Sequence, residues 1–84
     1  MTYSIIFTNR ALKALKKLDK PIQERIISAL ERIRIRPGAY VKKLVGDPGY
    51  KLRVGDYRVI MDIDGEKLVI LVIMVGHRRN IYDR

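Results

Sequence analysis

The sequence predicts an α+β domain in which a helical hairpin packs on one face of a mainly antiparallel four-stranded sheet, in the order β-α-α-β-β-β. Hydrophobic residues recur at helical spacing between residues 11 and 33, and they alternate with polar residues after residue 49. Gly55-Asp56 and Asp64-Gly65 are residue pairs typical of two-residue hairpin turns. With 84 residues, 48% of them hydrophobic, the chain can bury one core, so we expect a single domain over residues 1–84.

The first predicted strand covers residues 3–7, where aromatic and β-branched side chains alternate onto one face. Thr8 or Asn9 can cap the helix that follows, because a short side-chain oxygen accepts a hydrogen bond from the first turn. The apolar stripe of this helix consists of Ala11, Leu12, Leu15 and Leu18.

A second helix follows closely. Asp19-Lys20-Pro21 ends the first helix and starts the next, since proline suits a first helical turn. Arg36-Pro37-Gly38 stops the second helix, whose apolar stripe consists of Ile22, Ile26, Ala29, Leu30 and Ile33. The short junction predicts that the two amphipathic helices form an antiparallel hairpin.

Three further strands complete the predicted sheet. After a loop through residues 41–47, Tyr50–Val54 alternates apolar and basic residues, as a half-buried strand does. The chain turns at Gly55-Asp56 and returns over Tyr57–Ile63. Leu68–Val75 is uniformly apolar, which is typical of a central strand covered on both faces.

The net charge of +9 favours a polyanionic partner: nucleic acid, a ribonucleoprotein, an acidic protein or an anionic membrane. Residues 1–46 hold eleven basic residues against three acidic ones, whereas residues 47–84 are nearly balanced. The first half therefore supplies most of the long-range field, and a site in the second half must be recognised from local geometry.

Several classes of function lack the residues that they need. The absence of cysteine excludes disulfides and thiolate zinc sites, and a single histidine leaves little from which to build a metal site. No Ser-His-acid triad, phosphate-binding loop or dinucleotide fingerprint is present, so we predict no cofactor. The longest apolar run, residues 68–75, is far shorter than the roughly 18 residues of a membrane span. The first residues also lack signal-peptide features, so we expect a cytoplasmic protein without a membrane partner.

The turn at Gly55-Asp56 predicts that Arg53 and Arg58 are direct cross-strand neighbours, with Lys51 two residues along on the same face. Like charges in this position cost stability, so the arrangement points to a binding site for an anion. Arginine grips phosphate through two parallel hydrogen bonds, and lysine adds a compact charge. The alternative is a solvated strand face in a chain that is basic throughout.

The segment after the last predicted strand combines cations with one aromatic residue, Tyr82, at a strand exit where functional residues often occur. Tyr82 can stack on a base or donate a proton. Alternatively, Tyr82 closes the edge of the core and the neighbouring arginines aid solubility. A single histidine such as His77 is more often a packing residue than a catalyst.

The chain resembles the RelE branch of the RelE/ParE toxin superfamily through two segments, KLVGDPGYKLRVGDYRVI at residues 43–60 and VGHRRNIY at residues 75–82. The first predicted strand and helix also fit, so the resemblance covers essentially the whole chain. It implies a RelE-like fold and the activity of that family. RelE toxins of type II toxin–antitoxin systems are ribosome-dependent endoribonucleases that cut messenger RNA in the ribosomal A site, and a RelB-type antitoxin neutralises them.

The resemblance implies catalytic roles for five residues. Lys51 and Arg53 occupy the positions of two basic strand residues, of which the second is often lysine, so Arg53 is a departure. Arg58 and Arg78 match phosphate-binding arginines, and Tyr82 matches a terminal tyrosine. Metal-independent cleavage needs a deprotonated 2′-hydroxyl, compensation of the phosphorane charge and protonation of the 5′-oxygen. Lys51 is the better proton acceptor, because a guanidinium stays protonated.

The implied partners are the ribosome, messenger RNA and a RelB-type antitoxin, in a hetero-oligomer that can bind operator DNA. Binding of RNA and the ribosome is assigned to the other cations: Lys13, Lys16, Lys17, Arg32, Arg34, Arg36, Lys42, Lys43 and Arg79. Two alternatives stay open. A ParE-like inhibitor of DNA gyrase shares the fold but tends to lack the set of basic residues and tyrosine. A non-catalytic module would bind RNA or the ribosome through the same cations.

Overall fold

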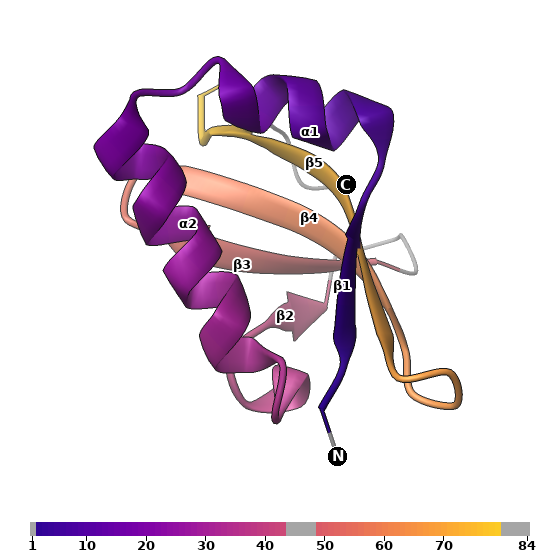
Figure 1. Ribbon diagram of the computed structural model, residues 1–84. Helices are drawn as coiled ribbons and strands as arrows, with labels where there is room; N and C mark the ends of the chain where they lie inside the picture. Colours follow the sequence, from indigo (N-terminus) through magenta and orange to yellow (C-terminus); the bar gives the residue numbers. More distant parts are fainter. Residues whose placement is uncertain (1, 44–48, 80–84) are drawn as a thin grey trace.

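Two helices lie on one face of a five-stranded sheet in the computed structural model, which describes residues 2–43 and 49–79 (Figure 1). Helix α1 packs on β5 and β1, whereas α2 packs on β3 and η1. The helices thus cover different parts of the same sheet face. In chain order the elements are β1 (Ser4–Phe7), α1 (Asn9–Lys16), α2 (Lys20–Ile33), the 3₁₀ helix η1 (Pro37–Ala39), β2 (Lys42–Lys43), β3 (Tyr50–Val54), β4 (Tyr57–Asp64) and β5 (Val69–His77).

The strand order is β1-β5-β4-β3-β2, with β1 parallel to β5 and every other neighbouring pair antiparallel. The predicted α+β class and mainly antiparallel sheet are confirmed, but the sheet has one strand more than predicted. Lys42 and Lys43, placed by the sequence in a loop, pair with Lys51 and Tyr50 as β2. A two-residue edge strand shows no hydrophobic period, so the pattern could not reveal it.

Helix α1 begins at a threonine cap. The Thr8 hydroxyl accepts a hydrogen bond from the Ala11 backbone N–H (3.1 Å) and donates one to the Ile73 carbonyl (3.1 Å). Thr8 is therefore the cap, and Asn9 is the first helical residue. Leu12, predicted to lie in the apolar stripe, is 38% exposed. Consecutive helical residues are about 100° apart, so Leu12 lies at the margin of the stripe that Ala11 centres.

Helix α2 begins with Pro21 in its first turn, as predicted. The connection from α1 is held by the Gln23 side chain, which donates a hydrogen bond to the Leu18 carbonyl at 2.7 Å. Ile26, Leu30 and Ile33 are almost completely buried beneath the helix. These contacts fix α2 against the sheet, with its polar side facing outward.

One hydrophobic core lies between the helices and the inner face of the sheet, and no polar or charged residue is buried within the described part of the chain. It consists of Ala11, Leu15, Ile26, Leu30, Ile33, Leu52, Val59, Met61, Ile70, Val72 and Val75. Strand β5 was expected to be covered on both faces, but Leu71 and Met74 on its other face are only half-buried. The helices cover one face, and a uniformly apolar strand does not reveal which of its faces is covered.

The β3–β4 hairpin has the register that the sequence predicted: Val54 lies opposite Tyr57 and Arg53 lies opposite Arg58. Gly55 in the turn has φ of +60°, a left-handed conformation that glycine adopts without steric cost. Local turn chemistry therefore fixes which side chains meet across the two strands. None of the helices in residues 2–43 and 49–79 is long and apolar enough to span a bilayer.

Candidate functional site

Basic side chains dominate an open hollow of about 270 Å³ where β2, β3 and β4 lie side by side. The hollow lies at the end of the sheet that α2 packs on, beside the chain that leaves η1. Its lining consists of Tyr40, Lys42, Lys51, Leu52, Arg53 and Arg58. A hollow with this lining suits an anion with an attached planar or apolar group.

Strand alternation explains how the cations come together. Leu52 is 6% exposed and points into the core, so its neighbours Lys51 and Arg53 lie on the other face of the sheet. Register then places Arg58 of β4 directly opposite Arg53. The prediction that these three residues lie on one face of the sheet is confirmed.

Lys42 adds a fourth cation that the sequence did not place here. It pairs with Lys51 across the β2–β3 ladder and lines the same hollow. We predicted Lys42 only as part of a general RNA-binding surface. Its position depends on a strand of two residues, so no sequence signal was available to find it.

Arg53 is tied to the hairpin turn. Its Nε–H donates a hydrogen bond to the Gly55 carbonyl at 3.1 Å. The bond holds the side chain at the open end of β3, where Arg53 is exposed. A guanidinium fixed in this way keeps its remaining N–H donors available for an anion.

The chain that leaves β5 returns to the same hairpin. The Arg78 backbone N–H donates to the Asp56 carbonyl at 2.9 Å, and Gly76 pairs with Arg58. Arg78 therefore lies beside the hairpin turn, although it is not among the described residues that line the hollow. Tyr82, the fifth predicted catalytic residue, lies outside the described residues.

His77 takes a packing position. Its ring meets the Tyr57 ring edge to face, with centroids 5.3 Å apart, and its Nδ1 accepts a hydrogen bond from the Arg79 backbone N–H. Alternation along β4 puts Tyr57 and Arg58 on opposite faces of the sheet. His77 thus contacts the side of the sheet away from the cation group.

The other predicted cations do not gather into one site. Most are exposed on separate elements: Lys13, Lys16, Lys17, Arg32, Arg36, Lys43 and Arg79. Arg34 instead ties α2 to the N-terminal strand region, since its Nε donates to the Tyr3 carbonyl (2.9 Å) and its Nη1 pairs with Glu31 (2.9 Å). Arg34 therefore has a structural contact as well as its charge.

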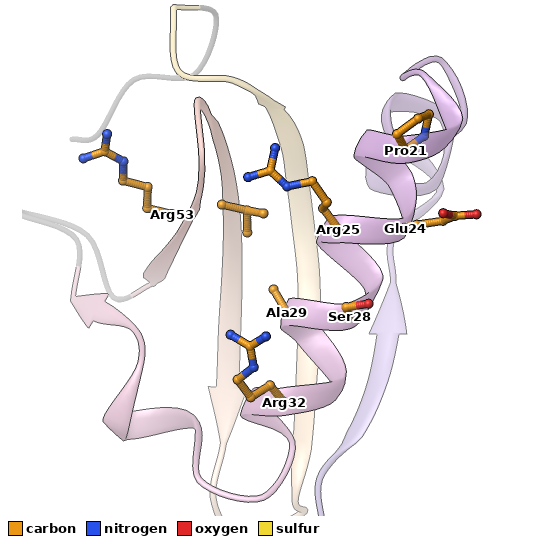
Figure 2. A pocket seen from close by; sticks show the side chains of 8 residues that line it. Pro21, Glu24, Arg25, Ser28, Ala29, Arg32 and Arg53 are labelled. Atoms are coloured by element: carbon orange, nitrogen blue, oxygen red, sulfur yellow. The ribbon is translucent and has the colours of Figure 1, made fainter.

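Sequence reasoning missed Arg25, which lines a second open hollow of about 590 Å³ between α2 and β3 (Figure 2). Arg25 and Arg32 are seven residues apart and so share one helix face. The seven-residue spacing can be read from the sequence, but the sequence does not show that α2 places Arg25 beside β3. Within residues 2–43 and 49–79, no three His, Cys, Asp or Glu side chains are grouped to hold a metal ion.

Comparison with known proteins identifies relatives along nearly the whole chain. The family described as "ParE toxin of type II toxin-antitoxin system, parDE" matches residues 5–82. The mRNA interferase toxin RelE of Escherichia coli (strain K12) is 36% identical over 81 residues, covering 93% of this chain and 85% of the relative.

Solved structures of toxin–antitoxin complexes contain the same fold. The complex RelBE2 from Mycobacterium tuberculosis has a chain with a TM-score of 0.85 and 27% identity, covering 93% of this chain and 100% of that one. The intact RelBE complex of E. coli has a chain with a TM-score of 0.77 and 36% identity, covering 89% and 95%. With the family match, the identity to RelE and the common fold in agreement, this chain belongs to the RelE/ParE toxin family of type II toxin–antitoxin systems.

Proposed function

We propose that this chain is the toxin of a type II toxin–antitoxin system and that, as a single domain, it cleaves messenger RNA in the ribosomal A site. The observation that carries the proposal is the cation group of Lys51, Arg53 and Arg58 on one sheet face. A relative that is 36% identical is named an mRNA interferase toxin, which supports the same reaction here.

The proposed reaction needs no metal ion. A 2′-hydroxyl attacks the adjacent phosphate, the bond to the 5′-oxygen of the next nucleotide breaks, and a 2′,3′-cyclic phosphate remains. Lys51 shares the proton transfers, while Arg58 and Arg78 offset the charge that builds on the phosphorane. Arg53 binds phosphate, and Tyr82 stacks on or orients a base.

The ribosome supplies the substrate geometry in this proposal. The hollow at Lys51 and Arg58 is lined by six residues, and so small a site needs the ribosome to align a 2′-hydroxyl with the phosphate that it attacks. Binding to the ribosome uses the exposed cations of α1 and the chain after α2, in the cytoplasm where translation takes place. Lys16 and Lys17 represent this surface.

A RelB-type antitoxin is the proposed protein partner. Solved relatives with 27% and 36% identity were determined as toxin–antitoxin complexes, RelBE2 and RelBE. The net charge of +9 fits an antitoxin that is acidic where it crosses the toxin. We expect the assembled complex to bind operator DNA.

Inhibition of DNA gyrase is the competing function, because the matching family is named for ParE. The cation group at Lys51, Arg53 and Arg58 favours the nuclease, since a gyrase inhibitor has no need of clustered phosphate-binding groups on one sheet face. A non-catalytic RNA-binding module needs the cations but has no use for a proton acceptor among them.

Expression of the chain in a bacterial host tests the proposal. Translation should stop, primer extension on a reporter message should detect cuts inside codons, and the cuts should be confined to messages engaged by ribosomes. Co-expression of the cognate antitoxin should restore growth. Arrest of replication with intact messages would favour gyrase inhibition, and arrest of translation without cuts would favour a non-catalytic module.

A further inference from the structure

The hollow between α2 and β3 is a second cationic surface, distinct from the hollow at Lys51 and Arg58. Figure 2 shows the Arg25 and Arg32 side chains extending from α2 toward β3. Their seven-residue spacing separates the two Cα atoms by about 10.5 Å along the helix axis. The hollow is lined by Pro21, Glu24, Arg25, Ser28, Ala29, Arg32, Arg53 and Val54.

Arg25 is held against the hairpin turn. A Cβ added to Gly55 would come within 2.9 Å of an Arg25 terminal nitrogen, so the guanidinium lies directly on the turn backbone. Arg53 donates its hydrogen bond to the carbonyl of the same glycine. Two arginines therefore contact the same turn residue from different sides, Arg25 from α2 and Arg53 from β3.

The charge of this hollow is almost entirely positive. Its one acid is Glu24, and Figure 2 shows the Glu24 carboxylate pointing away from Arg25 and Arg32. Ser28 lies between the two arginines along α2, and Figure 2 shows its hydroxyl on the same side of the helix as Glu24. Two guanidinium forks on one helix face match the oxygens of a phosphate chain better than an isolated carboxylate.

Arg53 joins the two hollows. It lines both of them, and Figure 2 shows its side chain pointing away from α2, on the side of β3 opposite to Arg25. Within the described residues, β2 pairs only with Tyr50 and Lys51, so the edge of β3 at residues 52–54 has no strand beside it. A chain of phosphates that crosses this edge from one hollow to the other would contact Arg53, which lines both.

We infer that the hollow between α2 and β3 binds phosphates of the same RNA strand whose reacting phosphate lies at Lys51 and Arg58. Arg53 contacts the strand where it crosses the β3 edge, and Arg25 and Arg32 bind the flanking phosphates. The choice of RNA as the ligand rests on the proposed function. Through this site the toxin binds phosphates of the message beyond the nucleotides that react.

The test compares the binding of RNA of two lengths by fluorescence anisotropy. The probes are 2′-O-methyl RNA of three and nine nucleotides, which cannot be cleaved, so the result is independent of nuclease activity. The variant is Arg25→Gln with Arg32→Gln. The matched control, Lys20→Gln with Lys67→Gln, removes the same charge from exposed positions outside both hollows.

The Arg25→Gln/Arg32→Gln variant should bind the nine-nucleotide probe more weakly and the three-nucleotide probe as wild type does. Loss of two phosphate contacts to a single strand should reduce the slope of log affinity against log salt by about 1.4. Between 50 and 200 mM salt, wild-type binding should then weaken about sevenfold more than binding by the variant. Arg25→Lys with Arg32→Lys should keep the salt slope and lose part of the affinity, because the charge remains and the forks are lost.

Three results would overturn the inference. An unchanged affinity of the double glutamine variant for the longer probe would show that the hollow between α2 and β3 does not bind the RNA. Equal losses for both probes, or an equal loss in the control variant, assign the effect to general charge. Normal binding of the nine-nucleotide probe with weakened binding of empty ribosomes assigns the arginines to ribosomal RNA instead of the message.

Discussion

The helices and the β3–β4 hairpin carry their positive charge in different ways. The lysines on α1 and at its C-cap, Lys13, Lys16 and Lys17, are exposed at positions set by helical spacing. No strand register brings them opposite another residue. On the hairpin, register brings Arg53 and Arg58 face to face. The comparison teaches that the number of charges indicates the kind of partner, whereas a fixed register indicates where chemistry can occur. The proposed site and the proposed steering surface should therefore respond differently to substitution.

The largest effect is expected from Lys51→Arg, which keeps the positive charge of the hairpin group and removes the proposed proton acceptor. Cleavage of ribosome-bound message should fall by about 10²–10⁴, the usual contribution of general acid–base catalysis, with ribosome affinity retained. Single-turnover cleavage with excess toxin measures the rate. Arg53→Lys is the matched exchange and should keep most of the rate. If both exchanges had the same effect, Lys51 would have no special role in proton transfer.

Arg58→Gln should lower the single-turnover rate by about 10²–10³, because one donor to the developing charge is lost in the transition state. Binding to programmed ribosomes should change far less, since only one of many cations is removed. Comparing the rate at saturation with the dissociation constant separates the two effects. A loss of affinity as large as the loss of rate would place Arg58 in the steering surface and erase the contrast with the helices.

Gly55→Ala tests the turn that sets the hairpin register. The substitution forces a side chain into a left-handed conformation, at a cost of about 1–2 kcal/mol, and pushes against Arg25. For a domain of this size, each kcal/mol lowers Tm by about 4–8 °C. Gly38→Ala is the control, because a Cβ there meets nothing within 4 Å. Thermal melts that shift equally for the two variants would mean that the turn does not constrain the hairpin.

The smallest effect is expected from Lys16→Ala with Lys17→Ala on α1. Association with ribosomes should weaken a few-fold and depend less steeply on salt, because two phosphate-directed charges are lost. The cleavage rate of message already bound should stay unchanged. Stopped-flow association at two salt concentrations, together with the single-turnover rate, measures both quantities. A fall in the bound rate would contradict the division between surface and site.

The features of the fold that could be predicted from the sequence are those set by interactions between neighbouring residues. Gly55-Asp56 requires a tight turn, and the turn fixes the pairing of Arg53 with Arg58, so the core of the site followed directly. The threonine cap and the proline start of α2 are equally local signals. Each of these depends on a few adjacent residues.

Features that depend on distant contacts could not be predicted. Strand β2 exists because the chain after η1 passes the edge of β3, and that proximity placed Lys42 beside Lys51. Whether one or both faces of β5 are covered depends on how the helices are placed, which apolar composition does not record. Arg25 became part of a candidate site only when α2 packed beside the hairpin turn.

The parallel pairing of β1 with β5 delays completion of the sheet until the last strand has been synthesised. The Thr8 hydroxyl reaches Ile73, 65 positions along the chain, and Ser4–Phe7 finds its partner strand only in residues 69–72. Ribosomes add about 5–20 residues per second, so the sheet stays incomplete for seconds while β1 and the helices are already outside the exit tunnel. The strands of the candidate site are made between these two halves of the pair. In the proposed function, an antitoxin present during synthesis would therefore first meet a nascent chain in which β1 still lacks its partner strand.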